Sequence, residues 1–275
     1  MSTNPLISLT KAHLPGRVFA LPSKGLFYEP GVLSDVSMKH NGEISVYPLP
    51  GSAEIILKSS DLLYTGRAII EVCKLCVPDI VQPEKLLAKD VDALFIFFRM
   101  STYGNELELQ SIHDCKDSKE HSYMVNLETI LSQPNNDMLN EHTLDLFSVE
   151  LPGPIHVRLQ PLIFDDMMSI IHMKQQVEKQ IAERIKLNQN YSDLENEFKN
   201  KDLCAIIHSA NGITDKAKLL EWINILTSPQ KKCIYDKYKE LDTWGYKIFY
   251  ELTCKDCGQV YNHNLELDPI SFFSG

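Results

Sequence analysis

The sequence predicts an α+β fold in which short strands begin the chain and a later β module is split in two by a helical hairpin or bundle. Hydrophobic residues alternate with polar residues over 106–127 and again over 248–252, and this two-residue period is typical of strands. Between these segments, apolar residues recur at every fourth position from Met173 to Ile185, which is typical of an amphipathic helix. Each alternating segment leads into the tripeptide Cys-Lys-Asp, so we interpret the two segments as halves of one β module.

Residues 1–58 are predicted to be a β-rich segment. Turns that are rich in proline and glycine, such as Pro48-Leu49-Pro50-Gly51, separate short runs of strand-forming residues. Two such runs are Ile44 to Val46 and Ile55-Ile56-Leu57.

Residues 59–104 are predicted to be helical. An apolar face begins after Ser60 and continues to Val77, and Pro78 ends it. Pro83 is well placed to start a further short helix, which leads into the apolar run that ends at Phe98.

Residues 105–163 are predicted to hold the first cysteine hairpin and further strands. Residues 129–146 are polar and favour a loop. Strands are expected to resume over Phe147–Leu162, where Pro152-Gly153-Pro154 breaks the run.

Residues 164–245 are predicted to form a helical bundle, and residues 246–275 the second cysteine hairpin with an aromatic tail. We interpret Ser192 to Glu195 as a capping box that opens the second helix of the bundle, and Gly212 as its end. Thr214 and Ser228-Pro229 are expected to open two more helices.

Charge and hydropathy argue against several classes of function. The net charge is -10 and the pI is about 5.4, so we expect no nucleic-acid partner and no binding to anionic membranes. The longest wholly apolar stretch, Ala93 to Phe98, has six residues, whereas a membrane-spanning helix needs about 20. The N-terminus lacks the basic and apolar regions of a signal peptide, so we expect the protein to stay in the compartment where it is made.

Four common motifs of enzymes and nucleotide-binding proteins are missing from the sequence. It contains no GxxxxGK[ST], GxGxxG, HExxH or GxSxG pattern, and these are the signatures of phosphate binding, dinucleotide binding, zinc proteases and serine hydrolases. We therefore predict that the protein is not an enzyme, with no catalytic residues and no small-molecule substrate.

The cysteines point to a metal site. Seven is an odd number, and the density is below that of a secreted disulfide framework. Cys254-Lys-Asp-Cys257, followed by Gly258, has the spacing of a zinc knuckle, in which a tight turn directs two thiolates at one ion. Cys115-Lys-Asp-Ser118 repeats this pattern with serine in place of the second cysteine. We interpret the pair as a split, zinc-ribbon-like module.

A four-ligand zinc site in this module would need one ligand besides Cys115, Cys254 and Cys257. Serine is a poor zinc ligand, and the nearest candidates in the sequence are His121 and His113. The alternative is a degenerate ribbon without metal, held together by packing alone. A further CxxC pair, Cys73 and Cys76, lies in an apolar helical stretch and is interpreted as inert core cysteines.

The C-terminal tail carries two adjacent aromatic residues, Phe272 and Phe273. Two large apolar rings at the end of a chain either fill the protein's own core or dock into a partner. The sequence leaves both possibilities open, and both residues are candidates for a partner-binding role.

Several segments, taken in order, resemble the baseplate hub family of T-even-type contractile-tailed bacteriophages. They are Leu21-Pro-Ser-Lys-Gly-Leu-Phe-Tyr28, Cys76-Val-Pro-Asp-Ile80, Arg99-Met-Ser-Thr-Tyr103-Gly104, the Cys254–Cys257 pair and the terminal phenylalanines. The resemblance spans nearly the whole chain. It implies a structural or assembly role in the central hub of the tail baseplate, with other hub and tail proteins as partners. It also implies a location in the host cytoplasm during assembly and in the baseplate of the virion if the protein is retained there.

Three alternatives remain at this point. The first alternative is a tail assembly chaperone that leaves before the virion is finished. The second is a zinc-ribbon protein that binds nucleic acid, and the third is a thiol oxidoreductase that uses Cys254 and Cys257. Residues 247–275 contain only Lys247 and Lys255 as basic residues, which disfavours the nucleic-acid alternative. Asp256 opposes the thiolate that an oxidoreductase needs.

Overall fold

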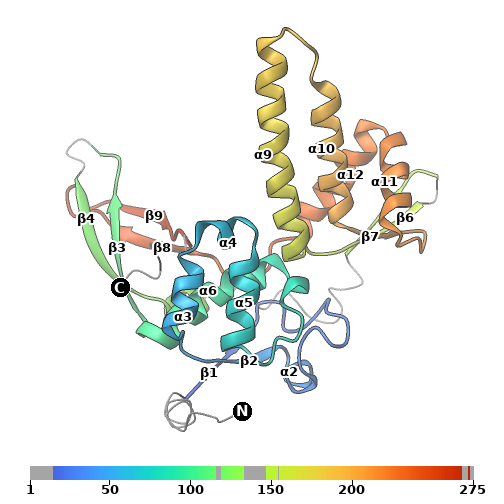
Figure 1. Ribbon diagram of the computed structural model, residues 1–275. Helices are drawn as coiled ribbons and strands as arrows, with labels where there is room; N and C mark the ends of the chain where they lie inside the picture. Colours follow the sequence, from blue (N-terminus) through green and yellow to red (C-terminus); the bar gives the residue numbers. More distant parts are fainter. Residues whose placement is uncertain (1–14, 116–118, 133–146, 154, 268–271, 273–275) are drawn as a thin grey trace.

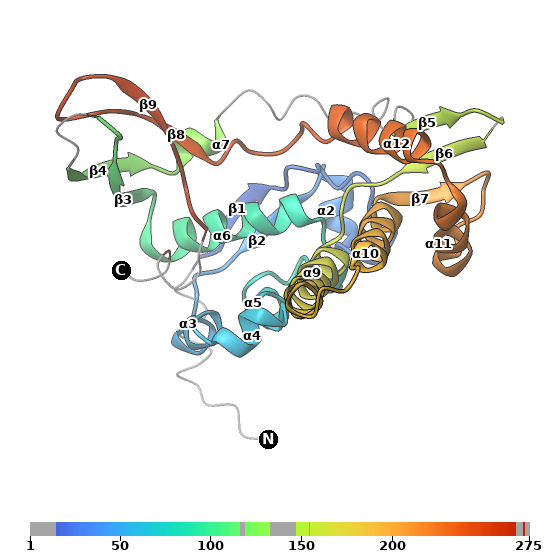
Figure 2. The same cartoon turned by 90° about the horizontal axis from the view of Figure 1, so that it is seen from above.

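The computed structural model shows a mixed α+β protein with small antiparallel sheets (Figure 1). It describes residues 15–115, 119–132, 147–153, 155–267 and 272. Figure 2 shows two cysteine-bearing hairpins at one end of the molecule and a three-stranded sheet with its helices at the other. The α+β class is therefore confirmed.

The N-terminal segment forms one small sheet and a short helix. Strands β1 (Arg17–Ala20) and β2 (Glu43–Val46) pair in antiparallel fashion, and helix α2 (Asp35–Lys39) lies between them in the sequence. Phe19, Ile44 and Val46 are buried, so one face of this sheet covers the first hydrophobic core.

A helical body follows the first sheet. Its elements are α3 (Gly51–Leu57), α4 (Ser60–Tyr64), α5 (Arg67–Cys76), the 3-10 helix η1 (Pro83–Lys85) and α6 (Ala88–Tyr103). Helix α6 is buried along most of its length, because the first sheet, the neighbouring helices and the C-terminal tail all pack around it. Within the described residues, no helix is long and apolar enough to cross a membrane.

The strand that we expected at Ile55-Ile56-Leu57 is wrong, because these residues lie in helix α3. The helix buries Ala53 and Leu57, four positions apart, and leaves Ile55 73% exposed. Four-residue spacing is helical, whereas a strand would place Ile55 and Leu57 on one face. The β-branched residues alone suggested the wrong period.

Two antiparallel hairpins project from this body as an arm (Figure 1). The first consists of β3 (Glu106–Ile112) and β4 (Glu120–Asn126), followed by the short helix α7 (Glu128–Leu131). The second consists of β8 (Phe249–Thr253) and β9 (Val260–Asn264). Both hairpins form where the alternating segments predicted them.

The far end of the molecule combines a three-stranded sheet with four helices. The sheet has the order β5 (Ser148–Leu151), β6 (Ile155–Leu159), β7 (Ile207–Ala210). The helices are α9 (Phe164–Lys186), α10 (Ser192–Ala205), α11 (Lys216–Ile225) and α12 (Ser228–Leu241). A second hydrophobic core fills the space between the sheet and α10, α11 and α12.

Strand β7 interrupts the region that we expected to be wholly helical. Helix α10 ends at Ala205, and Gly212 follows β7 instead of closing the helix. The expected capping box at Ser192 is also wrong: the N-cap is Tyr191, whose side chain makes no capping hydrogen bond, and the Ser192 amide donates to Asn190 Oδ1 at 2.9 Å. The Ser192 hydroxyl instead donates to Asn190 Oδ1 at 2.8 Å, so a nearby loop residue takes its hydrogen bond.

The start signals of the last two helices lie one residue from the predicted caps. Asp215 caps α11 by accepting hydrogen bonds from the amides of Ala217 and Lys218. Thr227 and Gln230 form a capping box at the start of α12, with Pro229 in its first turn. Both helices therefore begin with ordinary capping chemistry.

Candidate metal centre

The first hairpin buries one face and ends in a loop that carries Cys115. Along β3, Leu107, Leu109 and Ser111 are buried and the residues between them are exposed. His113 and Cys115 follow β3 directly. Ser118, the expected substitute for a second cysteine, lies outside the described residues.

The second hairpin ends in a tight turn around the CxxC pair. The Cys254 amide donates to the Gln259 carbonyl at 2.8 Å, and the Gly258 amide donates to the Cys254 carbonyl at 2.9 Å. Gly258 has a φ of +74°, a conformation that costs glycine little and other residues more. The turn places Cys254 in a buried position and leaves Cys257 exposed.

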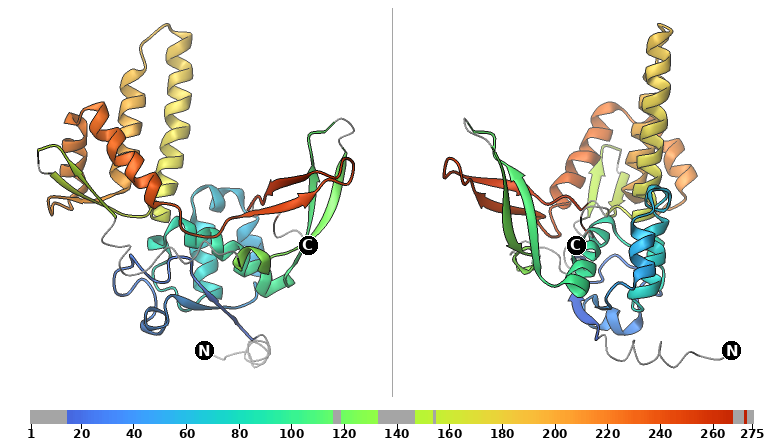
Figure 3. Two further views of the ribbon diagram at one scale, coloured as in Figure 1. Left: turned by 180° about the vertical axis from the view of Figure 1, so that it is seen from behind. Right: turned by 60° about the vertical axis from the view of Figure 1, so that its left-hand side comes forward.

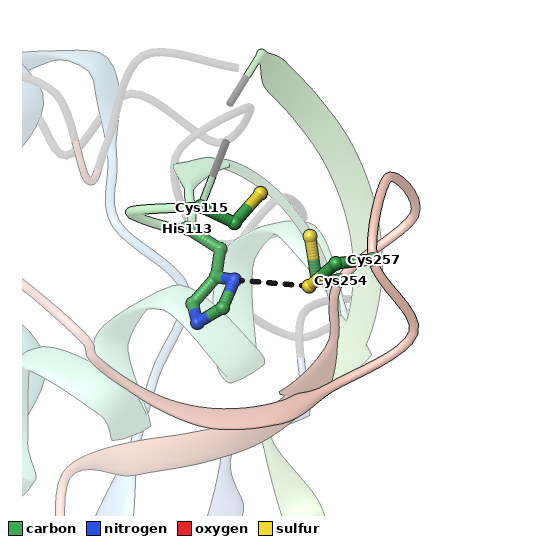
Figure 4. A group of neighbouring side chains, drawn as sticks. All are labelled: His113, Cys115, Cys254 and Cys257. Carbon is green, nitrogen blue, oxygen red and sulfur yellow. Dashed lines mark hydrogen bonds between the residues drawn. The ribbon is translucent and has the colours of Figure 1, made fainter. Parts of the chain in front are cut away.

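The two hairpins bring four metal-ligand side chains together (Figure 4). One ligand atom from each of His113, Cys115, Cys254 and Cys257 lies within 4.8 Å of all the others. His113 Nδ1 is 3.4 Å from Cys257 Sγ. Two of the donors come from the first hairpin and two from the second, although 139 positions of sequence separate Cys115 from Cys254.

This donor set fits a tetrahedral metal ion. With zinc bonds of about 2.0–2.3 Å to nitrogen and sulfur, tetrahedral geometry places neighbouring donor atoms roughly 3.3–3.8 Å apart. The His113–Cys257 separation of 3.4 Å lies within that range, and all other donor pairs lie within 4.8 Å. Three thiolates and one imidazole can hold a metal ion of the zinc type.

Backbone geometry favours the thiolate form of Cys254. The pKa of this thiol is lowered to about 6, first because the Cys257 amide donates to the sulfur, although burial opposes the effect. The Asp256 amide and the side chains of Cys257 and His113 lower it further. A metal binds the thiolate and not the thiol, so the turn stabilises the binding form.

His121, our first candidate for the fourth ligand, lies outside this cluster. Its Nε2 is 2.8 Å from Asp256 Oδ2, so the ring contacts the turn between the two cysteines and not their sulfur atoms. His113, the other candidate, is the histidine that lies with the three cysteines. In an extended chain, residues two positions apart lie on one face, so the spacing between His113 and Cys115 could have indicated this choice.

Further contacts hold the hairpins face to face. Ser111 Oγ is 2.8 Å from His263 Nδ1 and accepts a hydrogen bond from the Tyr261 hydroxyl at 2.9 Å. The His113 ring stacks on Tyr261, with 4.6 Å between ring centroids. The stacking of His113 on Tyr261 thus joins a ring of the first hairpin to a ring of the second.

The other CxxC pair belongs to the core. Cys73 and Cys76 lie in α5 and are fully buried. Burial raises the pKa of Cys76 to about 11, and the pKa of Cys73 is raised as well, first by burial. Both thiols are therefore neutral near pH 7, and neither belongs to the cluster of donors, in agreement with the inert interpretation.

The described part of the tail packs against the protein itself. Phe272 is 4% exposed and belongs to the first hydrophobic core. Arg99 of α6 donates a hydrogen bond to the Phe272 carbonyl, and its guanidinium lies 5.4 Å from the centroid of the Phe272 ring. Phe273 lies outside the described residues.

A comparison with protein families gives one match over most of the chain. A family model described as T4 bacteriophage base plate protein matches residues 52–274. No curated protein and no solved structure gives a significant match. The matched range includes both hairpins and the helices between them.

Proposed function

The chain belongs to the T4 bacteriophage base plate protein family, whose model spans residues 52–274, and from this we propose that it is a structural component of the central hub of the baseplate. A structural or assembly role in the phage baseplate follows from the family. The finer assignment to the hub is supported by the ordered motifs that begin at Leu21 and end at Phe273. In this role the protein acts through contacts with other hub and tail proteins.

The shape of the molecule supports a role in protein–protein contacts. Helix α9 and its partner α10 stand away from the body, as does the arm on the other side (Figure 3). Of the 23 residues of α9, only Phe164 is buried. Projections of this kind enlarge the surface available to neighbouring subunits without adding to the protein's own core.

We further propose that Cys115, Cys254, Cys257 and His113 bind one zinc ion. The convergence of these four donors supports this assignment. Four protein ligands leave no open position for a catalytic water, so the ion is structural. It links two hairpins that are distant in the sequence and thereby fixes the arm.

Metal content tests the zinc proposal. Protein purified without added metal is expected to contain about one zinc per chain, measured by elemental analysis. Cys254→Ser is expected to lose the metal, whereas Cys233→Ser, which changes an exposed cysteine outside the cluster, is expected to keep it. A metal-free wild-type chain would contradict the proposal.

Quantitative mass spectrometry of purified virions tests the hub assignment. We expect the protein in the particles at a fixed ratio to other baseplate proteins, and in isolated baseplates as well as in whole tails. If infected cells need the protein for tail assembly but finished particles lack it, the assembly chaperone is the correct alternative. Its host-cytoplasmic location during assembly would then be its only site of action.

A further inference from the structure

We propose that His121 and Asp256 are a positioning pair, which holds the CxxC turn against the first hairpin and so prepares the four donors for the metal. The proposal rests on the zinc site proposed above. It gives His121 a role next to the metal centre instead of a place in its ligand set.

The pair joins the two hairpins at the turn itself. Asp256 lies between Cys254 and Cys257, and His121 lies on β4. Their side chains are only 15% and 24% exposed. Asp256 Oδ2 is 2.8 Å from His121 Nε2 and also accepts a hydrogen bond from the Lys119 amide at 3.2 Å. Because an ionised carboxylate only accepts hydrogen bonds, Nε2 of His121 carries the proton.

The other residue between the two cysteines contacts the same strand. Lys255 Nζ donates to the Ser122 carbonyl at 2.6 Å and lies 4.9 Å from the centroid of the Tyr123 ring. Both residues between the cysteines are therefore attached to residues 119–123. The turn cannot move away from β4 without breaking these contacts.

This attachment positions two of the four donors. Cys254 and Cys257 flank the attached dipeptide, while His113 and Cys115 belong to the hairpin that holds it. Without the attachment, metal binding would have to order the two hairpins relative to each other. The free energy cost of this ordering would weaken the metal affinity. Groups that orient ligands in this way typically contribute about 10–100-fold to metal affinity.

The experiment compares full-length variants that remove each hydrogen bond with variants that keep it. His121→Ala and Asp256→Ala remove the contact. In His121→Gln the amide nitrogen can still donate, and in Asp256→Asn the amide oxygen can still accept. Glu251→Ala, an exposed change on β8, is the control. Zinc affinity is measured by competition with a chelator, and the ligand set by the absorption spectrum of the protein loaded with Co²⁺.

We expect both alanine variants to bind zinc about 10–100-fold more weakly, with the Co²⁺ spectrum unchanged. The double alanine variant should be no weaker than Asp256→Ala alone, because the hydrogen bond that His121→Ala removes is already lost in Asp256→Ala. Glutamine and asparagine should recover most of the loss. Affinity within twofold of wild type in both alanine variants would overturn the proposal. A changed Co²⁺ spectrum in His121→Ala would also overturn it, because His121 would then be a ligand.

A measurement on metal-free protein separates this proposal from the zinc proposal. In the presence of a chelator, the amides of 249–264 are expected to exchange faster in His121→Ala and Asp256→Ala than in wild type. Equal exchange rates would overturn the positioning role. If the wild-type chain binds no zinc but the exchange rates differ, the zinc proposal fails and the attachment of the turn to β4 stands.

Discussion

Asp90 is a buried carboxyl group that fastens the N-terminal loop to helix α6. It accepts hydrogen bonds from the Ser23 amide at 2.9 Å, the Ser23 hydroxyl at 2.5 Å and the Tyr28 hydroxyl at 2.6 Å. Burial raises the pKa of Asp90 to about 6 in spite of these hydrogen bonds, and burial also raises the pKa of Asp92 to about 6. Both carboxyl groups, which lie in one helical turn, therefore keep their protons up to a higher pH than an exposed aspartate does.

These two residues are expected to make the protein less stable as the pH rises. Because their pKa in the folded state lies above the ordinary value of about 3.9, the unfolded chain loses these protons at a lower pH than the folded chain does. Their contribution to the free energy of unfolding is therefore complete below pH 4 and is lost as the pH rises through 6. For Asp90 this amounts to something on the order of 3 kcal/mol.

Asp92→Asn isolates this effect, because asparagine has nearly the same shape and cannot ionise. The stability of the variant relative to wild type is expected to be about 2 kcal/mol greater at pH 7.5 than at pH 4.5, because Asp92 loses its proton near pH 6 in the folded chain and at about 3.9 in the unfolded chain. Urea unfolding at both pH values measures the difference. An equal gain at both pH values would mean that ionisation of Asp92 is not the cause.

Replacement of Phe272 tests whether the tail belongs to the core. Because the ring is 4% exposed, Phe272→Ala is expected to cost about 3–5 kcal/mol of the free energy of unfolding. Val260→Ala, at a side chain that is 65% exposed, is expected to change it by less than about 0.5 kcal/mol. If Phe272→Ala melts normally but no longer joins its baseplate partners, the tail docks into a neighbour instead.

In helix α3, the helical period determines which side chains are buried and which are exposed. The turn Pro48-Leu49-Pro50-Gly51 ends an extended segment, and Pro50 becomes the N-cap of the helix. From that point the helix places Leu57 in the core and Ile55 in solvent, where they are 0% and 73% exposed.

Two substitutions in α3 test this arrangement. We expect Leu57→Ala to cost about 2–5 kcal/mol and Ile55→Ala to change the free energy of unfolding by less than about 0.5 kcal/mol. Thermal or chemical unfolding of the two purified variants gives both values. Similar losses for the two variants would indicate a strand, in which both side chains share a face.

The described residues form two hydrophobic cores, and the described part of the arm packs on one of them. Leu107, Tyr250 and Leu252 of the hairpins belong to the core that also contains α6. The core between the three-stranded sheet and α10, α11 and α12 contains no residue of strands β3, β4, β8 or β9. Loosening of the arm is therefore expected to leave the far end of the molecule folded.

Metal removal tests this division. After treatment with a chelator, the amides of 106–126 and 249–264 are expected to lose protection against hydrogen exchange, because the proposed zinc ion would contribute on the order of several kcal/mol to the closed arm. The amides of 148–159 and 207–210 are expected to keep theirs. Exchange measured by mass spectrometry resolves both regions, and an equal loss everywhere would show that the molecule unfolds as one unit.

The sequence by itself determined the parts of the structure that depend on neighbouring residues. Alternation over 106–127 predicts the first hairpin, the spacing from Met173 to Ile185 predicts α9, and the repeated Cys-Lys-Asp predicts that both hairpins carry cysteines at their ends. Backbone geometry fixes these periods within a few residues, so no distant contact is needed to read them.

Only the tertiary structure decided the features that need contacts between distant segments. Strand β7 has four residues and pairs with β6, about 50 positions earlier in the chain. His113 joins the sulfur atoms and His121 joins Asp256 because of how the second hairpin lies on the first. Phe272 is buried where it packs against Arg99 of α6. These arrangements are stabilised by burial and by hydrogen bonds between distant segments. A local pattern of residues does not specify which distant segment each residue will contact.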